Sequence, residues 1–140
     1  EKNGIKYEYR YNYDSFTNSK YLEHKTTTMP SGLQKDISYS TTYEGNETIK
    51  TVVNKIATIN GKTYTQTTDY NNQTITYTSP LNKKVVTNFD ANTLLPKSTQ
   101  TANLESIEYE YNQKGFLTKQ SFGDRVTSYV YDNKNRVKTT

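Results

Sequence analysis

Alternating hydrophobic and polar positions recur along most of the chain. Residues 5–13 give the clearest example, because every second position is aliphatic or aromatic: Ile5, Tyr7, Tyr9, Tyr11 and Tyr13. A period of two residues places these side chains on one face of a β-strand. Similar patterns predict further strands at residues 37–43, 49–59, 62–69, 74–78 and 85–90.

Turn-forming residues separate the predicted strands. Asn60 and Gly61 form the strongest short signal for a tight β-hairpin. Residues 29–32, MPSG, and 79–82, SPLN, combine proline with glycine or asparagine, which turns favour. The stretch that follows Asp14 carries no comparable signal, so we expect a longer loop there. No segment shows helical periodicity with a cap at both ends.

These patterns predict an all-β protein with essentially no helix. We expect a single domain over residues 1–140, built as a continuous antiparallel meander of about a dozen strands in sequential hairpins. The sheet should be twisted and curved. A chain of 140 residues is too short to close a wide shell, so both terminal strands should have a free edge.

A short repeat marks the C-terminal part of the chain, where residues 109–117 return 20 positions later as 129–137. Each copy carries two tyrosines one residue apart, a turn, and an apolar residue that starts the returning strand. The turns should place Gly115 and Asn135 at positive φ, which glycine and asparagine tolerate. The repeated positions are Tyr109, Tyr111, Asn112, Gly115, Phe116 and Leu117, followed by Tyr129, Tyr131, Asp132, Asn135, Arg136 and Val137.

These copies resemble the YD-repeat, or RHS-repeat, family, whose repeat reads Tyr-x-Tyr-Asp-x-x-Gly-Arg-Leu-Thr. The second copy departs from this pattern at Asn135 and Val137, and the first at Asn112 and Phe116. The resemblance covers residues 79–140, as roughly three degenerate repeats that include residues 85–95. Residues 1–78 are expected to form longer, irregular hairpins.

The resemblance implies a structural role, because these repeats build β-sheet shells in bacterial toxins and related surface proteins. It implies a non-enzymatic wall segment, secreted or at the bacterial cell surface. Its partners would be flanking repeats or an enclosed or displayed domain of the same parent protein. The alternative is a surface module that binds a glycan or a protein through a tyrosine-rich sheet face.

The 14 tyrosines distinguish these two interpretations. Because they recur at one place in each repeat, we expect them to pack in cross-strand ladders, with Tyr109, Tyr111, Tyr129 and Tyr131 mostly buried. Tryptophan, the ring that most often stacks on sugars, is absent. Exposed rings would instead favour a binding face.

Composition narrows the classes further. The chain has no cysteine, which excludes disulfides and thiolate metal sites. Its net charge is +4, and the lysines and arginines are scattered, so we expect no nucleic-acid partner. No apolar run approaches the roughly 18 residues that a membrane helix needs, so no membrane insertion is expected.

No catalytic, cofactor or metal site is predicted. His24 is the single histidine and has no neighbouring ligand pattern. The carboxylates of Glu105, Glu108 and Glu110 suggest a glycosidase pair, but Glu108 and Glu110 alternate with tyrosines and should lie on a solvated face. The aspartates that end predicted strands are expected to accept hydrogen bonds from their own turns: Asp14, Asp90 and Asp132.

Overall fold

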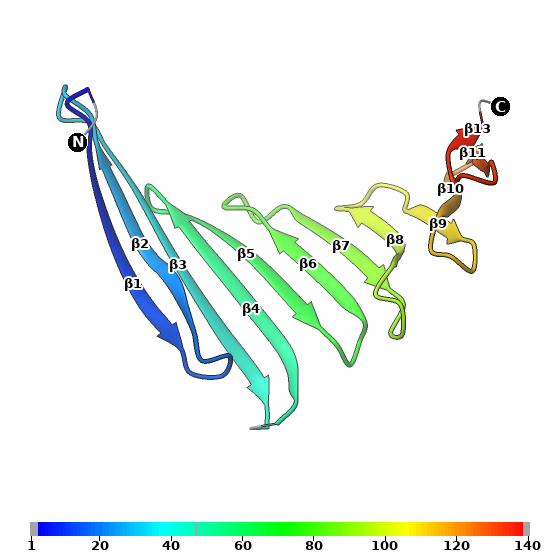
Figure 1. Cartoon of the computed structure of the whole chain (residues 1–140), viewed down its shortest axis with the longest axis horizontal. Coiled ribbons are helices and arrows are strands. Elements are labelled where there is room, and N and C mark those ends of the chain that lie inside the picture. Colours follow the sequence, from blue (N-terminus) through cyan, green and yellow to red (C-terminus); the bar gives the residue numbers. More distant parts are fainter. Residues whose placement is uncertain (1–2, 47, 139–140) are drawn as a thin grey trace.

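A computed structural model describes residues 3–46 and 48–138 and shows an all-β protein (Figure 1). Eleven strands form one antiparallel sheet in sequence order, and a short hairpin follows it. This arrangement confirms the predicted meander. The strands of the sheet are β1 (Lys6–Asp14), β2 (Ser19–Thr28), β3 (Gln34–Gly45), β4 (Lys50–Ile59), β5 (Lys62–Asp69), β6 (Thr74–Thr78), β7 (Lys84–Phe89), β8 (Pro96–Thr101), β9 (Ile107–Tyr111), β10 (Leu117–Phe122) and β11 (Arg125–Ser128). The final hairpin consists of β12 (Val130–Tyr131) and β13 (Val137–Lys138).

The sheet is open and curved. Strand β1 lies at one edge and β11 at the other, and no pairing joins them within the described residues. Figure 1 shows the strands fanning across the molecule from β1 to β8, with β9 to β13 rising at the far end. Both terminal strands of the sheet therefore keep a free edge, as the chain length predicts.

The expected long loop after Asp14 is wrong, because strand β2 begins at Ser19. The Asp14 carboxylate accepts hydrogen bonds from the backbone N–H groups of Phe16 and Thr17, at 2.9 and 2.8 Å, and Asn18 has a φ of 51°. These contacts make a four-residue turn without glycine or proline. A register shift opposite Arg10 and Tyr11 breaks the alternation of β2, which hid this strand in the sequence.

One turn geometry recurs four times along the chain. In each copy the first residue donates its N–H to the carbonyl four residues on, and its carbonyl accepts from the residue at the fourth position. That fourth position has positive φ and is glycine or asparagine, as expected for a three-residue hairpin loop. The four turns are Met29–Leu33, Ser79–Lys83, Asn112–Phe116 and Asp132–Arg136, with φ of 81° at Gly32, 57° at Asn82, 80° at Gly115 and 60° at Asn135.

The strand register sorts the side chains onto two different faces. Residues directly opposite in antiparallel strands point to the same side. Tyr39 pairs with Ala57, Ala57 pairs with Tyr64, and this side is called the tyrosine face. It carries Tyr7, Tyr9, Ile37, Tyr39, Tyr43, Val53, Ala57, Ile59, Tyr64, Ile75, Tyr77, Val85, Ile107 and Tyr109. The other side, the threonine face, carries mainly hydroxyl and amide side chains together with the aliphatic residues Val52, Ile56 and Val86. The hydroxyl and amide residues are Thr26, Ser38, Ser40, Thr42, Asn54, Thr58, Thr63, Thr65, Thr67, Thr74, Thr76, Thr78, Asn88 and Ser98.

The protein has almost no buried core. Among the described residues, only Phe89, 4% exposed, and Ser98, 9% exposed, are buried. The accessible surface is 10489 Å². A compact protein of this mass, 16.2 kDa, would expose about 7,500 Å². The excess arises because no second layer covers either face of the sheet.

The last hairpin continues the meander past an interruption. Tyr129 donates its N–H to the carbonyl of Thr118 at 2.9 Å, which extends the pairing of β10 with β11 by one step. Thr118 lies at a register shift in β10, so the strand bends there and is interrupted before Val130. Strand β12 then pairs with β13 as its own two-stranded sheet.

Candidate binding face

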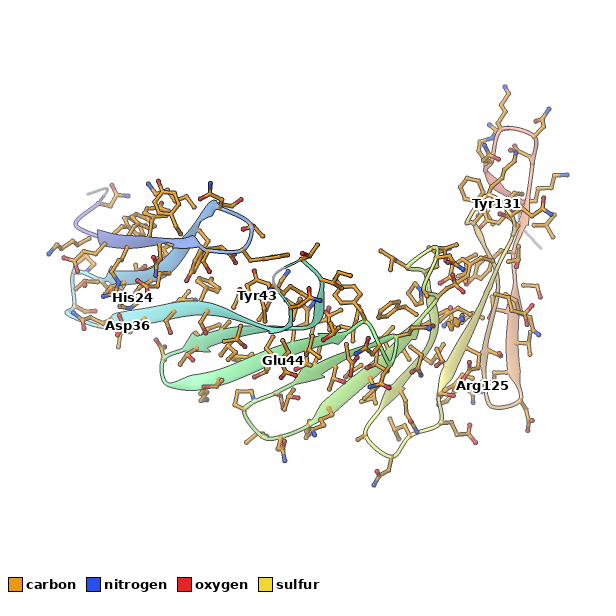
Figure 2. All side chains as sticks on the ribbon, turned by 90° about the horizontal axis from the view of Figure 1, so that it is seen from below. His24, Asp36, Tyr43, Glu44, Arg125 and Tyr131 are labelled. Atoms are coloured by element: carbon orange, nitrogen blue, oxygen red, sulfur yellow. The ribbon has the colours of Figure 1, made fainter. Side chains whose placement is uncertain are left out.

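The tyrosine face is hollowed into a groove of about 870 Å³ over strands β3 to β7. Figure 2 shows the curved sheet from below, with Tyr43 on its concave side. The floor of the groove is built from Tyr39, Ala57, Tyr64, Tyr77 and Val85. A second hollow of about 900 Å³ shares Tyr64 and Lys83 with this groove and extends it past the turn at Gly61.

The hairpin register explains why these side chains gather. Asn60 and Gly61 have φ of 49° and 76°, which gives the two-residue turn that locks Ile59 opposite Lys62. With that register, Tyr64 lies opposite the small side chain of Ala57. Ala57 leaves room between the rings of Tyr39 and Tyr64, so the face is hollow at that point.

The groove tyrosines are not packed in a ladder. Tyr39, Tyr64 and Tyr77 are 39%, 44% and 49% exposed. Among the described residues none of these three rings contacts another ring. Exposed aromatic rings with an apolar body and a hydroxyl tip are typical of contact surfaces.

The tip of the β1–β2 hairpin closes one end of the groove. The Tyr43 hydroxyl donates a short hydrogen bond to the Asp14 carboxylate, and the Tyr43 ring lies 5.4 Å from the Phe16 ring. The ammonium group of Lys50 lies 4.7 Å from the centre of the Phe16 ring. The hydrogen bond to Asp14 raises the pKa of Tyr43 to about 12 and lowers the pKa of Asp14.

Lysines lie on both faces of the sheet, whereas most of the carboxylates lie on the threonine face. The strand register places Lys25, Lys35, Lys55 and Lys62 on the tyrosine face. It places the carboxylates of the same region on the threonine face: Glu8, Asp36, Glu44 and Asp69. The groove therefore combines apolar surface with positive charge.

The repeated tyrosines lie outside this groove and are more covered than exposed, as expected, although none of them is fully buried. Tyr109, Tyr111, Tyr129 and Tyr131 are all half-buried, because the single-layer sheet leaves one side of each ring uncovered. Burial and the neighbouring Tyr109 raise the pKa of Tyr111.

The two repeats do stack on each other. The rings of Phe116 and Tyr131 have centres 5.2 Å apart, and the Tyr131 hydroxyl donates to the carbonyl of Leu117 at 2.7 Å. The two pairs that flank the repeated turns are equivalent, since Tyr111 faces Leu117 and Tyr131 faces Val137. This equivalence supports the 20-residue register between the two copies.

The turn residues of the repeats have the expected local roles. Asn112 accepts hydrogen bonds from the N–H groups of Lys114 and Phe116, and Asp132 accepts from those of Lys134 and Arg136. Arg136 also forms an ion pair with Asp132 at 2.8 Å. The bond from the backbone of Arg136 lowers the pKa of Asp132.

Asp90 caps its own turn in the same manner. Its carboxylate accepts from the N–H groups of Asn92 and Thr93, at 3.0 Å each, and forms an ion pair with Lys97 at 3.1 Å. These contacts, the bond from Thr93 first, lower the pKa of Asp90 to about 2. Together with Asp14 and Asp132, this confirms the aspartates as turn acceptors. The turn that Asp90 begins is one residue longer than the repeat turn, since its N–H reaches Leu95.

The residues weighed for catalysis do not come together. His24 faces Asp36 at 3.8 Å on the threonine face (Figure 2). Glu110 forms an ion pair with Lys119 at 2.8 Å, and Glu108 accepts a short hydrogen bond from Ser106. Within residues 3–46 and 48–138, no group of three or more histidine or acidic side chains is placed to hold a metal ion.

The sequence did not single out the groove residues Tyr39, Tyr64 and Tyr77. Each of the three tyrosines does lie within a predicted strand, so the sequence contained part of the information that places them. What was missing is the register across the five strands β3 to β7, because the turn at Asn60 and Gly61 fixes the register only between β4 and β5.

No protein-family model matches this chain, and no curated protein matches its sequence. The part of the chain that the structure describes holds no helix long and apolar enough to cross a membrane.

Proposed function

We propose that this chain is a non-enzymatic wall segment of a β-sheet shell, of the kind built by the RHS-repeat proteins it resembles. Its tyrosine face would turn inward and enclose or support a partner polypeptide. Flanking repeats would pair with the free edges of β1 and β11. In this proposal the protein acts outside the cytoplasm, as a secreted or surface-attached assembly.

The observation that carries this proposal is the uncovered apolar face of a single-layer sheet. Apolar surface of this extent stabilises a protein only when it is removed from water, by about 25 cal/mol per Å². The groove presents Tyr39, Tyr64 and Tyr77 to solvent, while threonine is the commonest residue on the opposite face of the same strands. One face richer in aromatic rings and one richer in hydroxyl groups is the pattern expected of a wall. The recurrent turn and the stacked repeats support growth of the sheet by addition of further units.

The second candidate function is a surface module that binds a glycan or a protein through the same face. The exposed and mutually separated rings of Tyr39, Tyr64 and Tyr77 favour it. A glycan array would distinguish it from the wall. A binding module should retain a defined glycan and lose it in the Tyr77→Ala variant, whereas a wall segment should retain none.

Cysteine accessibility tests the wall directly, because the 140 residues contain no cysteine. Tyr64→Cys measures the accessibility of the tyrosine face, and Thr63→Cys, one position away on β5, measures that of the threonine face. Both side chains are exposed. Each variant would be placed in the longest natural polypeptide that carries these residues, and in the 140-residue chain. The rate of maleimide labelling is then measured in both settings.

A wall segment should protect Cys introduced at position 64 in the longer polypeptide by at least tenfold relative to the 140-residue chain. The residue at position 63 should label at a similar rate in both. Equal labelling at position 64 in the two settings would overturn the wall proposal. Protection of both positions would also overturn it, because a wall keeps its outer face in water.

A further inference from the structure

We propose that the groove of the tyrosine face receives an acidic polypeptide with apolar side chains between its carboxylates. This inference names the partner class for the proposed wall and therefore rests on that function. It is carried by the charge of the groove, which is independent of the repeat resemblance. Three lysines line the two hollows: Lys55, Lys62 and Lys83.

None of the described residues forms an ion pair with these three lysines. Of the acidic residues that the structure describes, Asp14 alone lines either hollow, and it already accepts a hydrogen bond from Tyr43. Some lysines elsewhere on the sheet do have partners. Lys119 pairs with Glu110, and Lys25 lies 5.5 Å from the ring centres of Tyr7 and Tyr9. The groove thus presents cations that the described residues do not neutralise.

The surface between these lysines favours a polypeptide over other polyanions. Ala57, Val85 and the ring bodies of Tyr39, Tyr64 and Tyr77 line the groove. Affinity for a nucleic acid grows with the number of phosphates that lysine or arginine neutralises, and three lysines neutralise few. A polypeptide can place apolar side chains against this surface and carboxylates against the separated lysines.

The dimensions of the groove suggest the length of the bound segment. From β3 to β7 the face crosses four strand spacings, about 19 Å in all. An extended polypeptide covers this distance with about six residues. A twelve-residue probe is therefore long enough to span the groove and reach the lysines that line the two hollows.

The probe is a fluorescein-labelled peptide of alternating valine and glutamate, titrated with the 140-residue chain by fluorescence anisotropy. Its matched control replaces every glutamate by glutamine. Two further probes are an oligouronate and a single-stranded DNA of equal negative charge. The protein variants are Lys55→Glu with Lys62→Glu in the groove, and Lys84→Glu, which is exposed on the threonine face of β7. Thermal melts confirm that the variants remain folded.

We expect the acidic peptide to bind more tightly than the glutamine peptide by at least tenfold. The double variant should weaken its binding by about tenfold, since each reversal replaces an attraction by a repulsion. Lys84→Glu should change the dissociation constant by less than twofold.

Equal binding of the glutamine peptide, or no binding of either peptide, would overturn the inference. Tighter binding of the uronate or the DNA would assign the groove to another class of ligand. Concentration-dependent dimerisation in sedimentation, abolished by the double variant, would make a second copy the occupant and would also overturn it. The cysteine-labelling experiment measures whether the tyrosine face is enclosed, whatever the charge of the partner. The wall proposal can therefore hold even if the acidic peptide does not bind.

Discussion

Tyr43 and Asp14, 29 positions apart in the chain, are joined by a hydrogen bond from the tyrosine hydroxyl to the carboxylate. Asp14 ends β1, and Tyr43 lies near the end of β3, two strands away in the sheet. The register of β2 with β3 ends at His24, so no described backbone pairing holds the tip of the β1–β2 hairpin against the sheet. The side-chain contacts of Asp14, Phe16 and Tyr43 hold it instead.

This contact should make the hairpin sensitive to alkaline pH. The hydrogen bond raises the pKa of Tyr43 from 10.0 to about 12. A raised pKa means that the contact stabilises the fold fully below pH 10 and that the gain is lost as the pH rises through about 12. In ¹³C NMR of ring-labelled tyrosine, Tyr43 should titrate near pH 12, above the ordinary tyrosine value of 10.0. Asp14→Asn should return its pKa toward 10.0.

The stabilisation from the contact between Tyr43 and Asp14 should also be lost at low pH. The bond from Tyr43 lowers the pKa of Asp14, so its stabilising effect is present above the ordinary value of 3.8 and is lost as the pH falls through the folded value. Tyr43→Phe should therefore increase the hydrogen exchange of the hairpin at neutral pH and add little at pH 2. An exchange rate that is unchanged at neutral pH would show that Phe16 alone holds the hairpin.

The repeated turns predict opposite effects at equivalent positions. Gly115 has a φ of 80°, and a β-branched side chain is strained there, so Gly115→Val should lower the free energy of unfolding by more than about 1 kcal/mol. Asn135 has a φ of 60°, and Asn135→Gly should be neutral or mildly stabilising. Urea denaturation measures both effects. A harmless Gly115→Val would mean that this turn does not determine the stability of the repeat.

The fold could be predicted well from the sequence, because strands and turns follow from the alternation of apolar and polar residues and from local turn residues. The alternation over residues 5–13 and the turn at Asn60 and Gly61 were enough to predict a meander with free edges. Burial was harder to predict, since it depends on a second layer that no local pattern reveals. The groove required the register of successive strands, and one bulge in β2 was enough to hide a ten-residue strand.

The edge of β1 should limit self-association through its charged side chains. Glu8 and Arg10 lie on the outer strand of the sheet and are exposed, and charge on an edge strand opposes pairing with another edge. The double variant Glu8→Val with Arg10→Val should associate at lower protein concentration in sedimentation velocity. Ser38→Val with Ser40→Val is the matched control, because it adds two valines to the same face of the inner strand β3. Equal association of the two variants would attribute the effect to hydrophobicity alone.

Tyr131 should determine whether the second repeat docks on the first. Its ring packs on Phe116, and its hydroxyl donates to the carbonyl of Leu117. Tyr131→Ala removes both contacts, and we expect a loss of about 2 kcal/mol, below the value for a fully buried aromatic ring because Tyr131 is half-buried.

The loss should be local, since β12 and β13 form a separate two-stranded sheet and such a hairpin is marginally stable alone. Hydrogen exchange should therefore quicken at the amides of Asp132 and Asn135, which are bonded in this hairpin, and stay unchanged at Gly115. Tyr131→Phe keeps the ring and loses only the hydroxyl bond, so it should cost about 1 kcal/mol. If Tyr131→Ala left the exchange at Asp132 and Asn135 unchanged, the tyrosine of the second repeat would not stack the units, and its role would be at an external surface.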